Sequence, residues 1–219
     1  MARKTNKTIK TKNLILCEGR DAEEFLITYL NSEALSYEPA FSNDFQVMDY
    51  GGITDLTSFL SALQKMDGYN VVQSLLIVRD AERNALGAKD SIKSSLKKSN
   101  LVVPEANNIW SCSSPKIGYL LFPTCDSLVK DGTLEDLCLS ILAEECGFGI
   151  IGDIQNFMDE LGFKYNRKYP HEFKTKLHTY FSVTDEYVSL KVGEAARAGA
   201  FDWNSDKLAP LKSFLSEII

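Results

Sequence analysis

Apolar runs that alternate with amphipathic segments constrain the fold of this 219-residue chain more than any other feature. Each run is followed closely by charged residues, glycine or proline, and the runs cover residues 13–17, 45–50, 71–80 and 116–122. Between them, apolar residues recur at spacings of three and four, which is typical of helices. Because parallel strands need long crossover connections, this alternation predicts a parallel sheet. We therefore expect an α/β fold, with a mainly parallel sheet flanked by helices.

The alternation ends near residue 130. Up to that point, we expect the helices to begin near Asp21, to cover residues 53–66 and to lie around residues 90–99. Beyond it, helical spacing predicts a mainly helical region, with helices over residues 133–146, 152–162, 171–182 and 206–218. Three parts follow: a flexible basic arm at 1–12, the α/β core at 13–130, and a helical region at 131–219 packed on that core.

Composition excludes several classes of protein. No apolar run approaches the roughly 18 residues of a spanning helix, and the first residues lack a secretory signal pattern, so we expect a cytoplasmic protein without a membrane partner. Five cysteines without a Cys-x-x-Cys pair argue against a disulfide framework and a zinc ribbon. A net charge of −6 argues against a nucleic-acid coat protein. It is compatible with an enzyme whose carboxylates hold metal ions against phosphates.

Acidic residues stand at the ends of two predicted strands. Glu18 ends the first strand, and Asp80 and Glu82 end the third. In a parallel sheet the carboxyl ends of neighbouring strands lie roughly 5 to 10 Å apart, so these carboxylates would repel one another unless they shared a cation. Mg²⁺ prefers oxygen ligands and keeps waters for substrate phosphates. The sequence thus predicts a site for Mg²⁺ or Mn²⁺, although acids are also common at exposed strand ends.

Short strings in this order resemble a known family. Residues 14–21, Leu-Ile-Leu-Cys-Glu-Gly-Arg-Asp, resemble the first Toprim motif, and residues 77–82 stand where Toprim proteins have Asp-x-Asp. The Gly51-Gly52 pair lies between them in the expected order. Together with residues 121–123, 132–137 and 191–215, the order is similar to that of an uncharacterised bacterial Toprim-like family allied to the OLD-type nucleases.

The resemblance implies a Rossmann-like Toprim core that cleaves or forms phosphodiester bonds. It implies that Glu18 transfers a proton or shares the metal, and that Asp80 and Glu82 bind it. Asp21 matches an additional acid of OLD-type sites. Glu82 replaces the more common second Asp, which puts the spacing of the metals in doubt. Glu135 and Asp136 are candidates for a third arm of the site, or they complement the dipole of the helix that they begin.

Basic residues supply candidate phosphate contacts. Arg20, Arg79 and Arg83 could neutralise a phosphate near the acids, or form surface ion pairs. A second group is interleaved with aromatic residues and consists of Lys164, Arg167, Lys168, Lys174 and Lys176. This group could hold a nucleic-acid backbone while aromatic rings stack on unpaired bases. Alternatively, Phe173, Leu177 and Phe181 form the buried stripe of a helix whose lysines face water.

Other motifs give no function. Residues 147–152 match Gly-x-Gly-x-x-Gly but do not follow a strand, so we interpret Gly147 as a helix C-cap and Asp153 as the next N-cap. Two histidines without a His-Glu-x-x-His motif argue against catalytic zinc. There is no P-loop lysine motif, so an ATP-driven step would need a separately encoded ATPase.

Three functions remain compatible with the sequence. The favoured one is an Mg²⁺-dependent Toprim-like phosphodiesterase, most simply a nuclease acting on DNA or RNA. The second is a non-catalytic Toprim-fold module that binds nucleic acid or a partner such as an ATPase, and it would be favoured if arginines neutralised the acids. The third, a receiver-type phosphoacceptor, lacks the expected acidic pair after the first strand and the lysine after a late strand.

Overall fold

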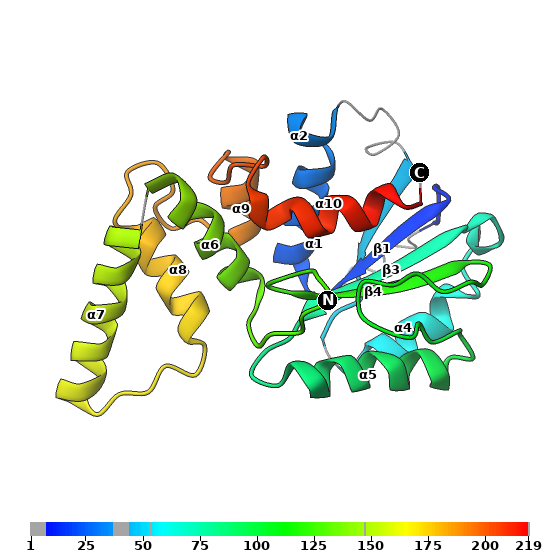
Figure 1. The fold of residues 1–219 in the computed structure, drawn as a ribbon, viewed down its shortest axis with the longest axis horizontal. Helices are drawn as coiled ribbons and strands as arrows, with labels where there is room; N and C mark the ends of the chain where they lie inside the picture. Colours follow the sequence, from blue (N-terminus) through cyan, green and yellow to red (C-terminus); the bar gives the residue numbers. More distant parts are fainter. Residues whose placement is uncertain (1–7, 37–43, 53, 147, 219) are drawn as a thin grey trace, which may run out of the picture.

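The computed structural model describes residues 8–36, 44–52, 54–146 and 148–218. Its centre is a four-stranded sheet with the order β2-β1-β3-β4, in which every neighbouring pair is parallel. The strands are β1 (Asn13–Cys17), β2 (Phe45–Asp49), β3 (Ser74–Asp80) and β4 (Lys116–Phe122). The predicted α/β fold, a Rossmann-like parallel sheet flanked by helices, is confirmed (Figure 1).

Helices cover both faces of this sheet. Below it in Figure 1 lie α4 (Leu56–Leu63) and α5 (Ala85–Lys98), and above it lie α1 (Arg20–Leu30), α9 (Val192–Arg197) and α10 (Ala209–Ser216). Successive residues of a strand point to opposite faces. In β1, Leu14 and Leu16 therefore belong to the core between the sheet and the helices α4 and α5. Ile15 and Cys17 belong to the core between the sheet and α1. Burial on both faces explains why these strands are continuous apolar runs.

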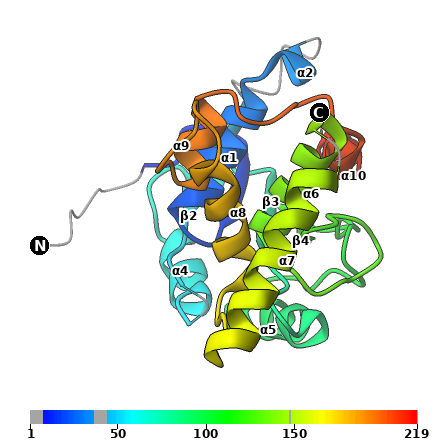
Figure 2. The ribbon, with the colours of Figure 1, turned by 90° about the vertical axis from the view of Figure 1, so that its left-hand side faces the viewer.

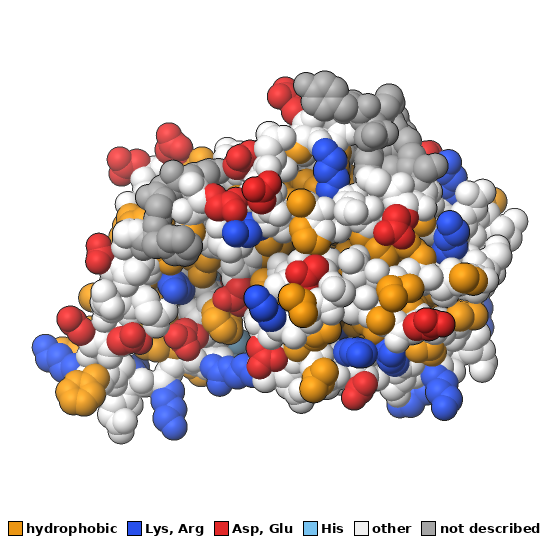
Figure 3. Space-filling model, in the orientation of Figure 1, with side chains coloured by type: hydrophobic (Ala, Val, Ile, Leu, Met, Phe, Trp, Pro, Cys, Tyr) orange, Lys and Arg blue, Asp and Glu red, His pale blue; other side chains and the backbone are white. Residues whose placement is uncertain are grey.

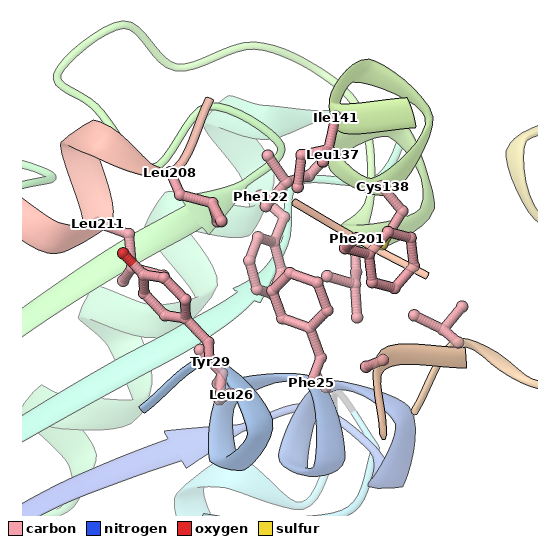
Figure 4. Packing of buried hydrophobic residues seen from close by; sticks show 14 of the residues in the cluster. Phe25, Leu26, Tyr29, Phe122, Leu137, Cys138, Ile141, Phe201, Leu208 and Leu211 are labelled. Carbon is pink, nitrogen blue, oxygen red and sulfur yellow. The ribbon is translucent and has the colours of Figure 1, made fainter. Parts of the chain in front are cut away.

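The helical region after residue 131 shares a core with the sheet. Phe25 of α1 packs edge-on against Phe122 of β4, with ring centroids 6.5 Å apart, and against Phe201, with centroids 5.7 Å apart. Leu137 and Ile141 reach the same cluster from α6 (Leu134–Cys146), as Figure 4 shows. These contacts anchor the beginning of the helical region on the upper face of the sheet.

Three helices project beyond one end of the sheet. They are α6, α7 (Phe148–Tyr165) and α8 (Glu172–Ser182), and they pack against one another beside the carboxyl ends of β3 and β4 (Figures 1 and 2). Short elements complete the chain: α2 (Glu33–Ser36), the 3₁₀ helix η1 (Tyr69–Val71) and the 3₁₀ helix η2 (Asp206–Leu208). Ligands in parallel sheets bind beyond the carboxyl ends of the strands, so this projection faces the place where chemistry is expected.

Several predicted helix boundaries are wrong. Helix α1 begins at Arg20 after Gly19 (φ 84°), so Asp21 lies inside the helix and does not cap it. Helix α5 begins at Ala85, earlier than predicted, because the side chain of Asn84 accepts a hydrogen bond from the N–H of Gly87. The 3₁₀ helix η2 and α10 replace the single helix predicted over 206–218.

The glycine-rich run before Asp153 is helical, contrary to our interpretation. Helix α7 begins at Phe148 and passes through Gly149 and Gly152, so Asp153 is not an N-cap. Ile151, Ile154 and Met158 are buried at helical spacing, and this packing outweighs the low helix propensity of glycine. Gly147, the predicted C-cap, lies outside the described residues.

The end of the predicted basic arm contacts the core. Ile9 is buried, and its N–H donates a hydrogen bond to the carbonyl oxygen of Asp67. Residues 1–7 of that arm lie outside the described residues. None of the helices in the described part of the chain has the length and apolarity needed to cross a membrane.

Candidate functional site

The ends of β1 and β3 lie side by side and bring the first predicted acids together. Cys17 is paired with Val78, so Glu18 follows beside Arg79 and Asp80 lies one residue farther along β3. Gly19 adopts a positive φ of 84°, which an L side chain rarely adopts, and the chain turns there from β1 into α1. This local geometry leaves Glu18 at the exposed end of the sheet.

Glu18 is surrounded by one cation, one hydroxyl and further acids. Its Oε2 lies 3.4 Å from Nε of Arg79 and accepts a long hydrogen bond of 3.5 Å from the hydroxyl of Tyr50. Burial raises the pKa of Glu18; Arg79 opposes this shift, and the negative charge of Glu82 adds to it. With a side chain 21% exposed, Glu18 can still reach solvent or a ligand.

Arg79 was expected to bind phosphate, but it lies inside the protein. Its side chain is only 3% exposed, and Glu18 is the carboxylate beside it. The buried Nε makes no hydrogen bond of good geometry within the described structure, although the charges of the two groups attract each other at 3.4 Å. Arg79 therefore neutralises Glu18 from within, and its burial separates it from a phosphate approaching through solvent.

Asp80 lies deeper than the other acids. One carboxylate oxygen, Oδ1, accepts a 2.8 Å hydrogen bond from the N–H of Leu134 at the first turn of α6. Burial raises the pKa of Asp80 to about 8, and the negative charges of Glu135, Glu18 and Glu82 contribute to this increase. Near neutral pH the carboxyl group of the metal-free protein therefore holds a proton, which a bound cation would displace.

Glu82 is held by its backbone in an unusual conformation. Its φ of 55° is uncommon for a residue with a side chain. Two backbone hydrogen bonds with Gly132 hold it there. The N–H of Glu82 donates to the carbonyl oxygen of Gly132 at 2.8 Å, and the N–H of Gly132 donates to the carbonyl oxygen of Glu82 at 2.7 Å. A side chain at Gly132 would lie 2.8 Å from the ring of Pro123, so glycine is needed for this close approach. Such strain concentrates at functional sites, where it fixes the direction of a side chain.

A cavity of about 160 Å³ lies between the carboxyl end of β3 and the beginnings of α6 and α8. Three carboxylates line it, those of Asp80, Glu82 and Glu135. Its remaining lining residues are Arg83, Thr133, Pro170, His171, Phe173 and Lys174. We call this cavity the carboxylate cleft. It brings acids from the end of the sheet and basic residues from the helical projection to one place.

The two acids that begin α6 differ in position. Glu135 lines the carboxylate cleft, whereas Oδ2 of Asp136 accepts bonds from the N–H of Thr133 at 2.8 Å and from its hydroxyl at 3.2 Å. Burial raises the pKa of Asp136 to about 6, although the hydrogen bonds from Thr133 and the charge of Lys176 act to lower it. Asp136 thus caps its own helix, while Glu135 adds a negative charge near Asp80.

Asp21 and Arg20 lie apart from the cleft. Oδ1 of Asp21 accepts a 3.2 Å hydrogen bond from the N–H of Gly193, which connects α1 to the first turn of α9. Arg20 is exposed and donates from Nε to Glu24 at 2.9 Å, and Glu24 also pairs with Arg197. The structure thus gives Asp21 a helix-connecting contact and Arg20 a surface ion pair.

The remaining predicted cations lie in three different settings. Arg83 and Lys174 line the carboxylate cleft, and Nη2 of Arg83 lies 3.4 Å from the carbonyl oxygen of Tyr169 and 3.3 Å from that of Pro170. Lys176 is half-buried in α8. The others are exposed at the end of α7 and in the loop after it: Lys164, Arg167 and Lys168. Of the stripe that the alternative interpretation of α8 expected, Leu177 and Phe181 are buried, whereas Phe173 is half-buried and lines the cleft.

Sequence reasoning missed Asp49 and Tyr50 at the end of β2. Oδ1 of Asp49 accepts hydrogen bonds from the N–H groups of Gly19, at 2.9 Å, and Gly51, at 2.7 Å. It therefore connects the turns that follow β1 and β2 and supports the segment next to Glu18. The search for acids at strand ends that found Glu18 and Asp80 would also have found Asp49.

The donor set of the cleft fits a hard divalent cation such as Mg²⁺ or Mn²⁺. Asp80, Glu82 and Glu135 offer carboxylate oxygens, and Asp80 has a raised pKa because of burial and of these neighbouring charges. Within the described ranges, no three Asp, Glu, His or Cys side chains are grouped so that they could hold one ion together. Mg²⁺ requires only one or two protein carboxylates, since it retains several waters.

The comparison with protein families identifies one match. A family model described as "Protein of unknown function (DUF3226)" matches residues 12–219, a range that includes all four strands and both sides of the carboxylate cleft. No curated protein and no solved structure matches the chain. Since the family match covers nearly the whole sequence, the protein belongs to the DUF3226 family.

Proposed function

We propose that the protein is an Mg²⁺- or Mn²⁺-dependent phosphodiesterase, most simply a nuclease that hydrolyses DNA or RNA. The observation that carries this proposal is the carboxylate cleft, which Asp80, Glu82 and Glu135 line beyond the end of β3. Burial raises the pKa of Asp80, and the negative charges of Glu135, Glu18 and Glu82 add to this increase. A divalent cation is the ligand that would offset these neighbouring negative charges.

Asp80 and Glu82 are the proposed metal ligands, with Glu135 as a third candidate. A Mg²⁺ ion held by these residues would supply positive charge for a phosphate oxygen and a more acidic water. The backbone bridge between Glu82 and Gly132 fixes the Glu82 end of the site, and the hydrogen bond from Leu134 fixes Asp80. Both ligands are thus oriented before a substrate arrives, which is what positioning catalysis requires.

Glu18 is the proposed proton acceptor. It stands at the end of the strand next to β3, and burial raises its pKa, which makes the carboxylate a stronger base. The charge of Arg79 opposes this increase and so favours the ionised form, which can accept a proton. At the mouth of the cleft, Arg83, His171 and Lys174 could attract the phosphate.

A second candidate is a non-catalytic module that binds nucleic acid or a separately encoded ATPase. The ion pair between Arg79 and Glu18 favours it, because a neutralised Glu18 needs no metal. The predicted Toprim relationship and the cytoplasmic location both stay predictions, and neither decides between the two candidates.

Titration calorimetry tests the first proposal directly. Mg²⁺ and Mn²⁺ are titrated into the wild-type protein, the Asp80→Asn variant and the Asp153→Asn variant, an exposed control on α7. Asparagine can still accept the hydrogen bond from Leu134, so the fold near Asp80 is preserved. The same proteins and a Glu18→Gln variant are then assayed for cleavage of single- and double-stranded DNA and RNA.

The two candidates predict different outcomes. The phosphodiesterase requires metal binding that disappears in Asp80→Asn and persists in Asp153→Asn, with metal-dependent cleavage that Glu18→Gln abolishes. If millimolar Mg²⁺ and Mn²⁺ neither bind nor support cleavage, the protein is no nuclease by itself, and the non-catalytic module becomes the better candidate.

A further inference from the structure

The end of α7 exposes aromatic side chains that the fold does not use. Phe163 is 93% exposed and Tyr165 is 57% exposed, and no large hydrophobic residue in the described part of the chain is more exposed than Phe163. Figure 3 shows hydrophobic and basic side chains together at this corner, at the lower left. A single exposed apolar residue is ordinary, but two aromatic rings among cations form a surface of defined chemistry.

This corner belongs to a segment that contains only basic charges. Between Glu160 and Glu172 the chain has three cations and no acid, in a protein whose net charge is −6. The cations are Lys164, Arg167 and Lys168, and none of them forms an ion pair in the described structure. We call residues 161–171 the basic aromatic segment. Its charge is available to an anionic ligand.

The basic aromatic segment is ordered by its own backbone. Asn166 has a left-handed φ of 48°, and the N–H of Arg167 donates a 2.9 Å hydrogen bond to the carbonyl oxygen of Gly162. This is the usual closing bond of a helix C-terminus. The ammonium of Lys164 lies 5.2 Å from the centre of the Tyr165 ring, so cation and ring already form a pair. A ligand would meet a preformed surface.

The segment continues into the carboxylate cleft. Pro170 and His171, at its end, line the cleft with Asp80 and Glu82. The guanidinium of Arg83 contacts the carbonyl oxygens at residues 169 and 170, which joins the segment to the loop after β3. A chain molecule bound along residues 163–171 would therefore lead to the proposed metal ligands.

We propose that the basic aromatic segment binds single-stranded nucleic acid and directs it into the carboxylate cleft. Cations spaced along the segment match a phosphate backbone, and exposed rings match the faces of unpaired bases. In a duplex those faces are stacked on one another, so the aromatic contacts would be lost. The inference rests on the proposed function, because it supplies the substrate class for that site.

Fluorescence anisotropy tests this with two probes, a labelled oligothymidylate and a labelled DNA hairpin duplex, in buffer with a chelator. The test variants are the double variant Phe163→Ala/Tyr165→Ala and the double variant Arg167→Ala/Lys168→Ala. The control is Phe157→Ala, which removes another exposed ring of α7 outside the segment. Light scattering of each variant reports the oligomeric state.

We expect the wild type to bind oligothymidylate more tightly than the duplex. The aromatic double variant should lose about tenfold or more in affinity, since each stacked base contributes that order of effect. The charge variant should reduce the salt dependence of binding, by a slope of roughly 0.7 per lost phosphate contact. Phe157→Ala should bind as the wild type does.

Three results would overturn the inference: equal binding of duplex and single strand, equal losses in Phe157→Ala and the aromatic variant, or a change of oligomeric state without a change in binding. The last would identify the surface as an interface between copies of this chain. Since the chelator prevents metal-dependent cleavage, binding is measured apart from catalysis. If the segment binds single strands but the cleavage assays with metal detect no activity, this inference is supported and only the proposed nuclease activity is contradicted.

Discussion

Arg79 and Glu18 form an ion pair between neighbouring strands, with Nε 3.4 Å from Oε2. The arginine is buried under the end of the sheet, and the glutamate lies at its surface. Parallel register explains the pair, because Cys17 is opposite Val78 and the next residues of both strands are therefore neighbours. Burial raises the pKa of Glu18, and the positive charge of Arg79 opposes this increase.

Replacing Arg79 by methionine should therefore destabilise the protein. The Arg79→Met variant leaves Glu18 partly buried without its cation, and we expect a loss of about 2 kcal/mol in the free energy of unfolding near pH 7. The double variant Arg79→Met/Glu18→Gln should recover part of this loss, because no charge is then buried. Urea unfolding of the four proteins in this double-mutant cycle measures the coupling. Additive losses would mean that the two charges do not interact.

The stability of the metal-free protein should decrease as Asp80 ionises. Its folded-state pKa of about 8, raised by burial and by Glu135, lies above the ordinary value of 3.8. The folded state therefore binds more protons than the unfolded state between these values, and stability falls as pH rises through that window. Relative to the wild type, the Asp80→Asn variant should gain about 3 to 4 kcal/mol between pH 5 and pH 8. Thermal or urea unfolding across this range checks the sign.

Mg²⁺ provides a further control on Asp80. If Asp80 binds the cation, Mg²⁺ at pH 8 raises the stability of the wild type and leaves the Asp80→Asn variant unchanged. A wild-type profile that runs parallel to that of the variant from pH 5 to pH 8 would show instead that Asp80 ionises normally.

Strain at Glu82 predicts a conflict between stability and function. Because glycine adopts a φ of 55° freely, Glu82→Gly should leave the free energy of unfolding unchanged or raise it by up to about 1 kcal/mol. Glu82→Ala retains the strain and should gain nothing. Both variants should lose metal affinity in calorimetry. A clear loss of stability in Glu82→Gly would indicate that this side chain supports the fold.

The strands and the convergence of their ends could be predicted, because both depend on local patterns. Continuous apolar runs such as residues 13–17 indicate strands buried on both faces, and a parallel sheet brings their carboxyl ends together. Glu18 and Asp80 were found in this way. Glu135, at the start of α6, was already a candidate third arm of the site. The entry of α8 was not predicted, since the cleft residues Glu82 and Lys174 belong to segments far apart in sequence.

Roles that depend on tertiary partners were not predictable from residue type. Asp21 accepts a bond from Gly193, which is 172 residues away, and Arg79 is buried because its strand is central in the sheet. Asp136 is a partial exception, because its position in the first turn of a predicted helix suggested that it complements the helix dipole, and the structure adds a capping bond from Thr133. Charge patterns alone do not show whether an arginine faces solvent or a carboxylate.

Glu135 should control the ionisation of Asp80. After burial, its negative charge is the largest cause of the raised pKa of Asp80, so the Glu135→Gln variant should lower that pKa from about 8 towards its ordinary value. Asp136→Asn is the matched control from the same helical turn, and its carboxylate is directed towards Thr133. Carbon-13 NMR titration of the side-chain carboxyl groups, without metal, follows Asp80 in each variant. If Asp136→Asn lowers the pKa as far as Glu135→Gln does, then the two acids act together and Glu135 has no special position in the carboxylate cleft.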